Sequence, residues 1–250
     1  LFATGTSFLI FGFIGLLFAV TIFPLINVAL AFNKPLRQSV SSRVIHYSWR
    51  TFLVSMRVLG VLELRLEGTQ ALQSDRGVIV IANHPSLIDV VILISVMKNA
   101  RGIVKQAVWN NPVMRSAVRS ANYIPNSDDP EALIAKCRET LANGDNIVIF
   151  PEGSRTVPGT PMKLQRGFAH LALRLDAPLR LVEIRCDPPT LLKGQKWYDI
   201  PATRPCFSVR VAERLDLTEL NLDDTPSRAV RQITRHVAAR YEEMSKHGSA

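Results

Sequence analysis

Two short apolar runs, each followed by a polar loop, constrain the fold of this 250-residue chain more than any other feature. They are "VIVIA" at 78–82 and "NIVIF" at 146–150. A strand with apolar residues at consecutive positions is buried on both faces, which is typical of parallel sheets covered by helices. Helical patterns alternate with the strand patterns along the rest of the chain. The sequence therefore predicts an α/β fold, with a mostly parallel sheet flanked by helices.

The other elements follow from periodicity and from signals at helix ends. Leu62, Leu64 and Leu66 alternate with charged residues, which indicates a half-buried strand. Asp129-Pro130-Glu131 combines a cap, a proline and an acid, which is a strong helix start. We expect further strands at 102–104, 179–185 and 206–213, and helices at 87–97, 112–120, 130–142, 167–175 and 226–245.

The N-terminal region has a different character, because residues 1–33 carry no charge. The apolar run at 8–32 is long enough to cross a bilayer core of about 30 Å as a helix. Pro24 and Asn27 interrupt it, so a kinked or interfacial helix is an alternative. Ala29-Leu30-Ala31 resembles a signal-peptide cleavage site, but the length of the run and the lack of a preceding basic residue favour a retained anchor.

A second helix is predicted at 39–59, where apolar residues recur at intervals of four and three. Arg43, Arg50 and Arg57 repeat every seven residues on nearly the opposite side. Such a helix could pack on the first helix, lie in lipid, or form a solvated surface helix. We expect residues 1–60 to form a membrane-anchoring segment of two helices, and residues 61–250 to form the α/β domain.

The net charge of +9 is concentrated in acid-free stretches. Residues 34–60 carry five cations and no acid, directly after the uncharged segment. A basic protein can bind nucleic acid or an anionic membrane surface, and the apolar N-terminus favours the membrane over nucleic acid. The positive-inside tendency then predicts a bacterial-type inner membrane, with the α/β domain on the cytoplasmic side. Two further acid-free basic stretches hold Lys98, Arg101, Lys105, Arg115 and Arg119, and Arg155, Lys163, Arg166 and Arg174.

The three cysteines, Cys137, Cys186 and Cys206, are scattered and show no CxxC spacing. We therefore expect reduced thiols rather than disulfides or a metal site.

The first polar loop, Asn83-His84-Pro85-Ser86, follows the first apolar run, and Asp89 comes five residues after His84. Sites in open α/β sheets form at the carboxyl ends of strands. We expect Asp89 to lie in the first turn of the next helix and to bond the ring of His84. Such a bond fixes the tautomer and leaves the other ring nitrogen able to remove a proton from a hydroxyl. Ser86 is a candidate helix cap. A purely structural His–Asp contact is the alternative.

The second polar loop, at 151–156, brings a carboxylate, backbone N–H groups and a guanidinium together. Arg155 offers a planar fork suited to phosphate or carboxylate, and Glu152 could orient a hydroxyl or hold Arg155. A surface turn with an ion pair is the alternative. If the strands at 78–82 and 146–150 are parallel neighbours, the two polar loops face one another across a cleft.

Together the loops resemble the glycerolipid and lysophospholipid acyltransferase family, which includes the 1-acylglycerol-3-phosphate acyltransferases. The first block of that family is His, four residues, Asp, and here it reads "HPSLID" at 84–89, preceded by Asn83. The third block is Phe-Pro-Glu-Gly-Thr/Ser-Arg, and here it reads "FPEGSR" at 150–155. The resemblance spans residues 60–185.

The resemblance implies direct transfer of an acyl chain from a thioester to a hydroxyl, with His84 as general base and Asp89 as its orienter. The donor would be acyl-CoA or acyl-acyl carrier protein, and no cofactor, metal or covalent acyl-enzyme is expected. The implied acceptor is a lyso-lipid, first 1-acylglycerol-3-phosphate, which would give phosphatidic acid. The implied substrate-binding residues are Asn83, Ser86, Glu152, Gly153, Ser154 and Arg155, and the candidate phosphate or carrier contacts are Lys105, Arg115, Arg119 and Arg166.

Two blocks depart from the family pattern. The second usually ends in an Arg that helps to hold the acceptor phosphate, but the matching stretch at 121–129 has no cation. The fourth, usually Val-Pro-Ile-Val-Pro-like, reads "APLRLVEI" at 177–184 and contains Arg180 and Glu183. Another lysophospholipid, an amino-acid lipid or a glycolipid is therefore an alternative acceptor.

Two rival functions belong to other classes. A non-catalytic basic membrane scaffold would leave both motifs without a purpose. A serine hydrolase would need a G-x-S-x-G elbow, which the sequence lacks.

Overall fold

The computed structural model describes residues 2–127, 129–156, 160 and 162–247. Within these residues one sheet of seven strands has the order β1-β7-β6-β2-β5-β3-β4. β6 and β7 pair antiparallel, and every other neighbouring pair is parallel, so the predicted mostly parallel sheet is confirmed. The strands are β1 (Glu63–Glu67), β2 (Ile79–Ala82), β3 (Ala100–Val104), β4 (Ile124–Pro125), β5 (Asn146–Ile149), β6 (Leu179–Asp187) and β7 (Cys206–Leu215).

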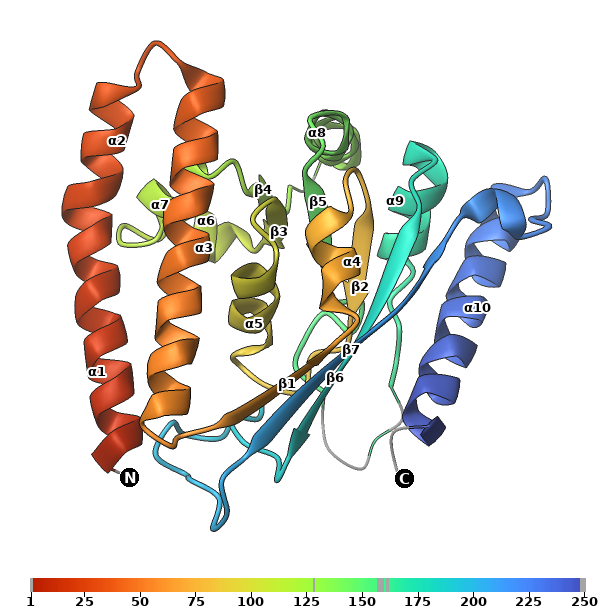
Figure 1. Cartoon of the computed structure of the whole chain (residues 1–250). Coiled ribbons are helices and arrows are strands. Elements are labelled where there is room, and N and C mark those ends of the chain that lie inside the picture. Colours follow the sequence, from red (N-terminus) through yellow and green to blue (C-terminus); the bar gives the residue numbers. More distant parts are fainter. Residues whose placement is uncertain (1, 128, 157–159, 161, 248–250) are drawn as a thin grey trace.

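Helices cover both faces of this sheet (Figure 1). The N-terminal helices are α1 (Phe2–Leu17), the π-helix η1 (Phe18–Ile22), α2 (Phe23–Ala29) and α3 (Lys34–Val58). The helices between strands are α4 (Thr69–Ser74), α5 (Asp89–Val96), α6 (Gln106–Asn110), α7 (Arg115–Ser120), α8 (Pro130–Ala142) and α9 (Gly167–Leu175), and the last are the 3₁₀-helix η2 (Leu217–Glu219) and α10 (Pro226–His247). Sequence analysis missed α4, α6 and β4, because elements of two to six residues are too short for an apolar pattern to repeat.

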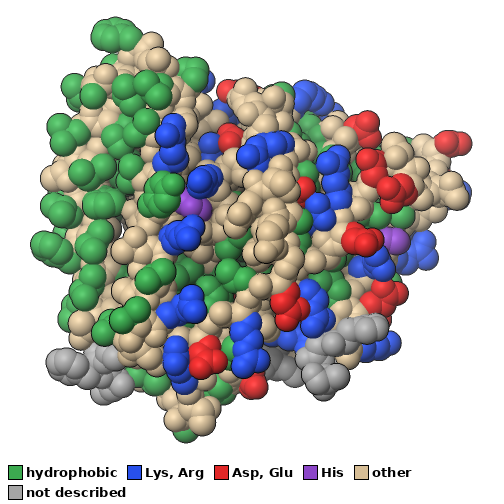
Figure 2. Space-filling view, in the orientation of Figure 1, with side chains coloured by type: hydrophobic (Ala, Val, Ile, Leu, Met, Phe, Trp, Pro, Cys, Tyr) green, Lys and Arg blue, Asp and Glu red, His purple; other side chains and the backbone are tan. Residues whose placement is uncertain are grey.

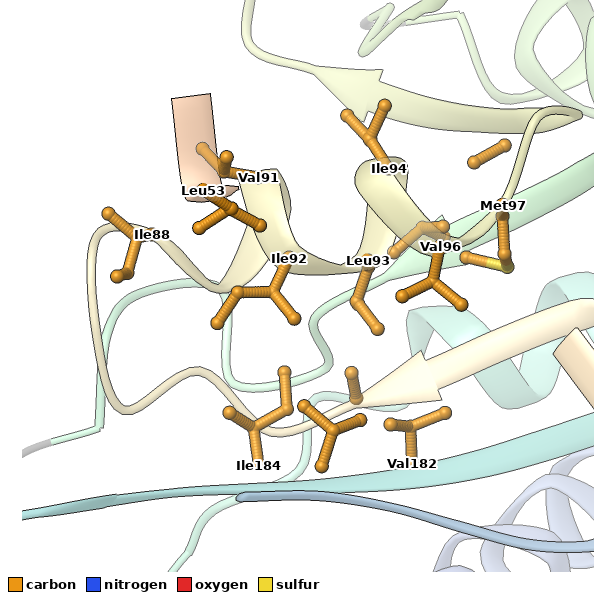
Figure 3. Packing of buried hydrophobic residues seen from close by; sticks show 14 of the residues in the cluster. Leu53, Ile88, Val91, Ile92, Leu93, Ile94, Val96, Met97, Val182 and Ile184 are labelled. Atoms are coloured by element: carbon orange, nitrogen blue, oxygen red, sulfur yellow. The ribbon is translucent and has the colours of Figure 1, made fainter. Parts of the chain in front are cut away.

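Alternation along the central strands explains why both faces are buried. Val80 and Ala82 of β2 belong to the core shared with α3 and α5, whereas Ile79 and Ile81 face the core shared with α8, α9 and α10. In Figure 3, Ile92 of α5 points toward the sheet. Side chains of successive strand residues point to opposite faces, so a run that is apolar at every position needs cover on both.

The N-terminal helices form a hairpin on one flank of the molecule, with α1, η1 and α2 running up and α3 running down (Figure 1). The structure continues as a helix through Pro24, and the π-helical turn η1 ends at Ile22, two residues before this proline. Proline lacks the N–H and crowds the preceding turn, and a wider π turn accommodates this. α3 begins five residues earlier than predicted, because the Asn33 side chain caps the helix by accepting from the N–H of Leu36 and Pro35 occupies its first turn.

The first helical stretch of the hairpin leaves a large apolar surface exposed. Thr4–Ala29 is 26 residues long and is apolar enough to cross a membrane by length and composition. Only 11% of its 18-residue apolar window is buried against the rest of the chain. The ring of Phe11 stacks on that of Trp49 in α3, with centroids 4.6 Å apart. The α3 residues Phe52, Leu53 and Met56 are buried in the core. Figure 2 shows hydrophobic side chains covering this flank, with Lys and Arg beside them.

Candidate active site

The two polar loops meet because β2 and β5 are parallel neighbours, with Ile81 opposite Ile149. The backbone N–H of His84 donates to Glu152 Oε1 at 2.9 Å. The N–H of Thr156 donates to the carbonyl oxygen of His84 at 2.7 Å. The predicted juxtaposition of the loops is therefore confirmed, and it is made through the backbone of His84.

His84 and Asp89 form a hydrogen-bonded pair at the start of α5. One carboxylate oxygen of Asp89, Oδ2, lies 3.0 Å from His84 Nδ1 and accepts from the N–H of Ser86 at 2.7 Å. An ionised carboxylate only accepts, so Nδ1 carries the proton and Nε2 presents its lone pair. The ring of His84 also stacks on Phe150, with centroids 4.3 Å apart. The ring is thus fixed in position and in tautomer.

The carboxylate of this pair lies in a demanding environment. Asp89 is fully buried, whereas the side chain of His84 is 18% exposed. Burial raises the pKa of Asp89, and the hydrogen bonds from His84 and Ser86 oppose that rise. Within the described residues, Asp89 Oδ1 has no hydrogen-bond partner. When the adjacent ring becomes an imidazolium, the buried carboxylate of Asp89 stabilises it strongly. Attraction between opposite charges is strong where water is excluded.

Asn83 and Ser86, both predicted to bind substrate, are engaged with the protein backbone here. Asn83 donates to the carbonyl of Ile184 at 2.8 Å and accepts from its N–H at 2.7 Å, which ties the loop to β6. Ser86 is buried and donates to the carbonyl of Thr190 at 3.0 Å. The prediction that Ser86 caps α5 is wrong, because the N-cap is Ile88 without a side-chain cap and the hydroxyl points to the chain after β6. Their substrate contacts remain predictions.

The second loop positions Glu152 and Arg155 in different directions. Glu152 Oε1 accepts from Thr156 Oγ1 at 2.9 Å as well as from the His84 N–H. Arg155 Nη1 donates to the carbonyls of Leu191 and Leu192, both at 2.9 Å. In the described part of the chain no ion pair joins Glu152 to Arg155, so the alternative in which the acid holds the guanidinium is not found.

Gly153 and Ser154 form the exposed turn of this loop. Gly153 has a φ of 69°, in the left-handed region that glycine adopts without strain. Its N–H donates to the carbonyl of Phe150 at 3.1 Å, which closes the turn. Ser154 is exposed. Any substrate contact of these two residues remains a prediction.

The segment 188–205 between β6 and β7 links the site to the hairpin. Leu191 accepts from the N–H of Leu87 at 3.2 Å and from Arg155. Further along, Trp197 packs against Phe8 of α1, with ring centroids 6.1 Å apart. A cavity of about 30 Å³ lies at this junction and is lined by residues that include Phe8, Ile88, Leu191 and Trp197. Sequence reasoning missed this segment, because it has no periodic pattern.

The four predicted phosphate or carrier contacts are spread over the molecule. Lys105 precedes α6, Arg115 begins α7, and Arg119 lies over the ring of Trp109 at 5.2 Å. Arg166 stands before α9 and lines a cavity with residues of α10. Among the described residues, no hydrogen bond or ion pair joins these cations to the His84 or Glu152 loops.

The unusual cations and acids of the fourth block have structural partners. Arg180 Nε and Nη2 bond the two carboxylate oxygens of Asp75 at 2.7 and 2.8 Å. Both side chains are nearly buried, and such a bidentate pair is stable only when it is well satisfied. Glu183 accepts from Arg185. No local pattern marks Asp75 as the partner of Arg180, and sequence reasoning missed it.

The described residues contain no cluster of three or more His, Cys, Asp or Glu that could hold a metal ion. The three cysteines are free thiols, as predicted.

Comparison with known proteins agrees with this fold. Residues 63–184, which contain both polar loops and the sheet strands that carry them, match the family described as Acyltransferase. The chain is thus similar to acyltransferases over the stretch that carries both polar loops.

Particular relatives are 1-acyl-sn-glycerol-3-phosphate acyltransferases of plants. The chain is 25% identical over 130 residues to a chloroplastic enzyme of Arabidopsis thaliana. This alignment covers 50% of this chain and 36% of that enzyme. It is 23% identical over 142 residues to a chloroplastic enzyme of Brassica napus (55% and 41%), and 27% identical over 122 residues to an enzyme of Cocos nucifera (46% and 39%). The chain thus spans about two fifths of the length of these relatives.

A solved structure has the same overall fold. The crystal structure of PlsC, the 1-acyl-sn-glycerophosphate (LPA) acyltransferase of Thermotoga maritima, superposes with a TM-score of 0.72. The match covers 96% of this chain and 95% of that one, at 18% identity. The shared architecture therefore includes the N-terminal hairpin as well as the sheet.

Proposed function

We propose that this protein transfers a fatty acyl group from an acyl thioester to the free hydroxyl of a lyso-lipid. The leading acceptor is 1-acylglycerol-3-phosphate, the substrate class in the names of the relatives, and the product would be phosphatidic acid. The observation that carries the proposal is the His84–Asp89 pair, in which the carboxylate bonds Nδ1 and leaves Nε2 as a base. The donor would be acyl-CoA or acyl-acyl carrier protein.

The geometry supports a general-base reaction. Nε2 of His84 takes the proton of the acceptor hydroxyl while that oxygen attacks the thioester carbonyl carbon. A new C–O bond forms, the C–S bond breaks, and the imidazolium returns the proton to the departing sulfur. Asp89 stabilises the imidazolium during this exchange. The atoms balance without a metal or a covalent acyl-enzyme.

The hairpin supports attachment to a membrane. Its exposed apolar surface runs along α1, η1 and α2, with residues that include Leu9, Phe13, Val20 and Val28. α3 packs along its length on α5 and α7, so a hairpin crossing the bilayer would draw the charged α/β surface into lipid. We propose that the hairpin lies in one leaflet, with its cations against anionic headgroups. The α/β domain would then face the cytoplasm from a bacterial-type inner membrane.

The number of cations near the active site bears on which lyso-lipid is the acceptor. Arg155 Nη1 is engaged with two carbonyls, and the second-block stretch 121–129 has no cation. A phosphate monoester is usually bound by more than one cation. This shortage favours a second candidate function, acylation of another lysophospholipid, an amino-acid lipid or a glycolipid.

Purified protein in mixed micelles tests the reaction. Thioester consumption and acylated product are measured with each lyso-lipid, for wild type, His84→Ala and the exposed control His170→Ala. His84→Ala should abolish transfer, and His170→Ala should behave as wild type. Thioester hydrolysis without acceptor would support a hydrolase, and no turnover by wild type would support a scaffold.

Vesicle flotation tests the membrane contact. Phe13 is 70% exposed on α1, and Leu66 is 43% exposed on the edge strand β1. Phe13→Asp should reduce co-flotation with anionic vesicles, and Leu66→Asp should not. Equal flotation of the two variants would contradict the assigned surface.

A further inference from the structure

A basic cavity separate from the His84 loops lies between the start of α9 and the first half of α10. Its volume is about 450 Å³. Arg166 precedes α9, and Arg228, Arg231 and Arg235 follow one another along one side of α10. All four are exposed. The lining is completed by Asp223, Gln232 and Thr234.

These arginines have few counter-charges around the cavity. Residues 225–241 contain no Asp or Glu. Asp223 is the one acid among the lining residues that the structure describes, and its carboxylate lies 3.5 Å from Arg228. Four like charges around one cavity repel one another. A bound anion with more than one negative charge would neutralise these cations and relieve their repulsion, so the cavity favours such an anion.

The arginines at the start of α10 do not stabilise the helix. Arg228 and Arg231 lie in its first two turns, where the helix dipole is positive and acids stabilise. Arg166 stands at the start of α9, so the positive end of a second helix dipole lies beside the cavity. Both ends raise the positive potential that a bound anion would meet.

The cavity lies on the flank of the molecule that carries α10. α10 lies on the flank opposite the hairpin (Figure 1). A lipid headgroup in the membrane under the hairpin would not reach this flank, so the anion comes from water. The same helix leads to the active site, since Tyr241 bonds the carbonyls of Ile81 in β2 and Val182 in β6. Arg235 lies six residues before Tyr241, about 9 Å along the axis.

We propose that this cavity binds the nucleotide phosphates of a coenzyme A-type acyl donor, whose thioester end reaches His84. The proposal rests on the acyl transfer proposed above. A cavity of this volume is in the range of small-molecule sites, about 300–1,000 Å³, and guanidinium groups bind phosphates in pairs of hydrogen bonds. A hollow site fits a diphosphate and a phosphomonoester, whereas the convex acidic helix of a carrier protein would need a flatter basic surface.

The binding experiment uses the full chain in detergent and adenosine 3′,5′-bisphosphate as the probe, with calorimetric titration. The test variant is Arg231→Gln/Arg235→Gln. The matched control is Arg240→Gln/Lys246→Gln, which removes two exposed cations from the same helix outside the cavity. Each lost charge-assisted contact costs about tenfold in affinity, so the test variant should bind about 100-fold more weakly. Equal binding by test and control variants, or no saturable binding by wild type, would overturn the proposal.

The kinetic experiment separates this proposal from the proposed function. The KM for acyl-CoA should rise by a similar factor in the test variant, whereas an acyl-pantetheine donor without the nucleotide should show the same KM in both proteins. No transfer by wild type from any thioester would sink the proposed function, while the calorimetric result would still judge the cavity. A KM increase for acyl-acyl carrier protein, without bisphosphate binding, would overturn the nucleotide assignment in favour of a protein carrier.

Discussion

Replacing Asp89 with Asn should slow acyl transfer while leaving the tautomer of His84 unchanged. The same oxygen, Oδ2, accepts from His84 Nδ1 and from the Ser86 N–H. An Asn amide that turned its NH₂ toward this position would meet the Ser86 N–H donor, so its oxygen should occupy the place of Oδ2. Nε2 then remains a base, and the variant loses charge rather than geometry.

The magnitude follows from that lost charge. In the transition state the carboxylate faces an imidazolium with a 3.0 Å contact. Two unit charges about 4 Å apart interact by about 4 kcal/mol at an effective dielectric constant near 20. Losing most of that attraction corresponds to a fall in kcat of about 10²–10³-fold. Asp89→Ala also loses the neutral hydrogen bond and should be slower by about a further tenfold.

Stability should change little, because two effects of Asp89→Asn oppose each other. Burial raises the folded-state pKa of Asp89, so the folded protein binds the proton more readily than the unfolded chain does. The folded state therefore loses stability as the pH rises from the unfolded-state pKa through the raised folded-state pKa, and Asn removes this cost at pH 8. Against this gain, the amide NH₂ takes the place of Oδ1, an atom without a hydrogen-bond partner among the described residues. A buried donor without an acceptor costs stability. Unfolding temperatures at pH 8 should agree within about 4 °C.

The assay is steady-state transfer from a thioester to a lyso-lipid in micelles, with unfolding temperatures measured on the same preparations. Turnover by Asp89→Asn within threefold of wild type would refute the use of the Asp89 charge. Turnover as low as that of His84→Ala would refute the retained tautomer, since it would mean that the base is lost altogether.

Three further predictions concern other parts of the molecule. Glu152→Ala leaves the backbone N–H of His84 without its hydrogen-bond acceptor, so kcat should fall by about 10–100-fold. Glu152→Gln should keep most of the activity. A change confined to the KM for the lyso-lipid acceptor would instead show that Glu152 binds substrate directly. Burial raises the pKa of Cys137 to about 11, and partial burial raises that of Cys186 to about 12, so at pH 8 about one thiol in a thousand or fewer is ionised. Both should react slowly with thiol reagents until the protein unfolds. Rapid labelling of Cys137 in native protein would contradict its burial. Tyr241→Phe removes a buried hydroxyl that bonds two strand carbonyls, and unfolding should occur about 2–4 °C lower; an unchanged unfolding temperature would show that these bonds do not stabilise the docking of α10.

Local sequence patterns were sufficient for the parts of the fold that depend on neighbouring residues. The run at 78–82 is apolar at every position, and β2 is buried on both faces. The start of α8 at Pro130 follows from the Asp129 cap, whose side chain accepts from two N–H groups of the first turn. Periods and caps operate within one or two turns, so the sequence shows them directly.

The His84–Asp89 contact was also predictable, because both residues belong to one strand-to-helix turn. Only five positions separate them, and the start of α5 turns the carboxylate back toward the ring. The same argument failed for Ser86, whose hydroxyl found a partner 104 positions away instead of the helix end.

What the tertiary structure alone decided are the contacts between segments far apart in the chain. Glu152 reaches the His84 backbone across 68 positions, and Asp75 pairs with Arg180 across 105. Arg166, which resembled a residue beside the site in sequence, joins the arginines of α10. These contacts depend on the strand order β6-β2-β5 and on the packing of α10 against the sheet. Hydrophobic periodicity specifies which face of each element is buried, but many strand orders bury the same faces, and the side chains that meet at strand ends differ among them.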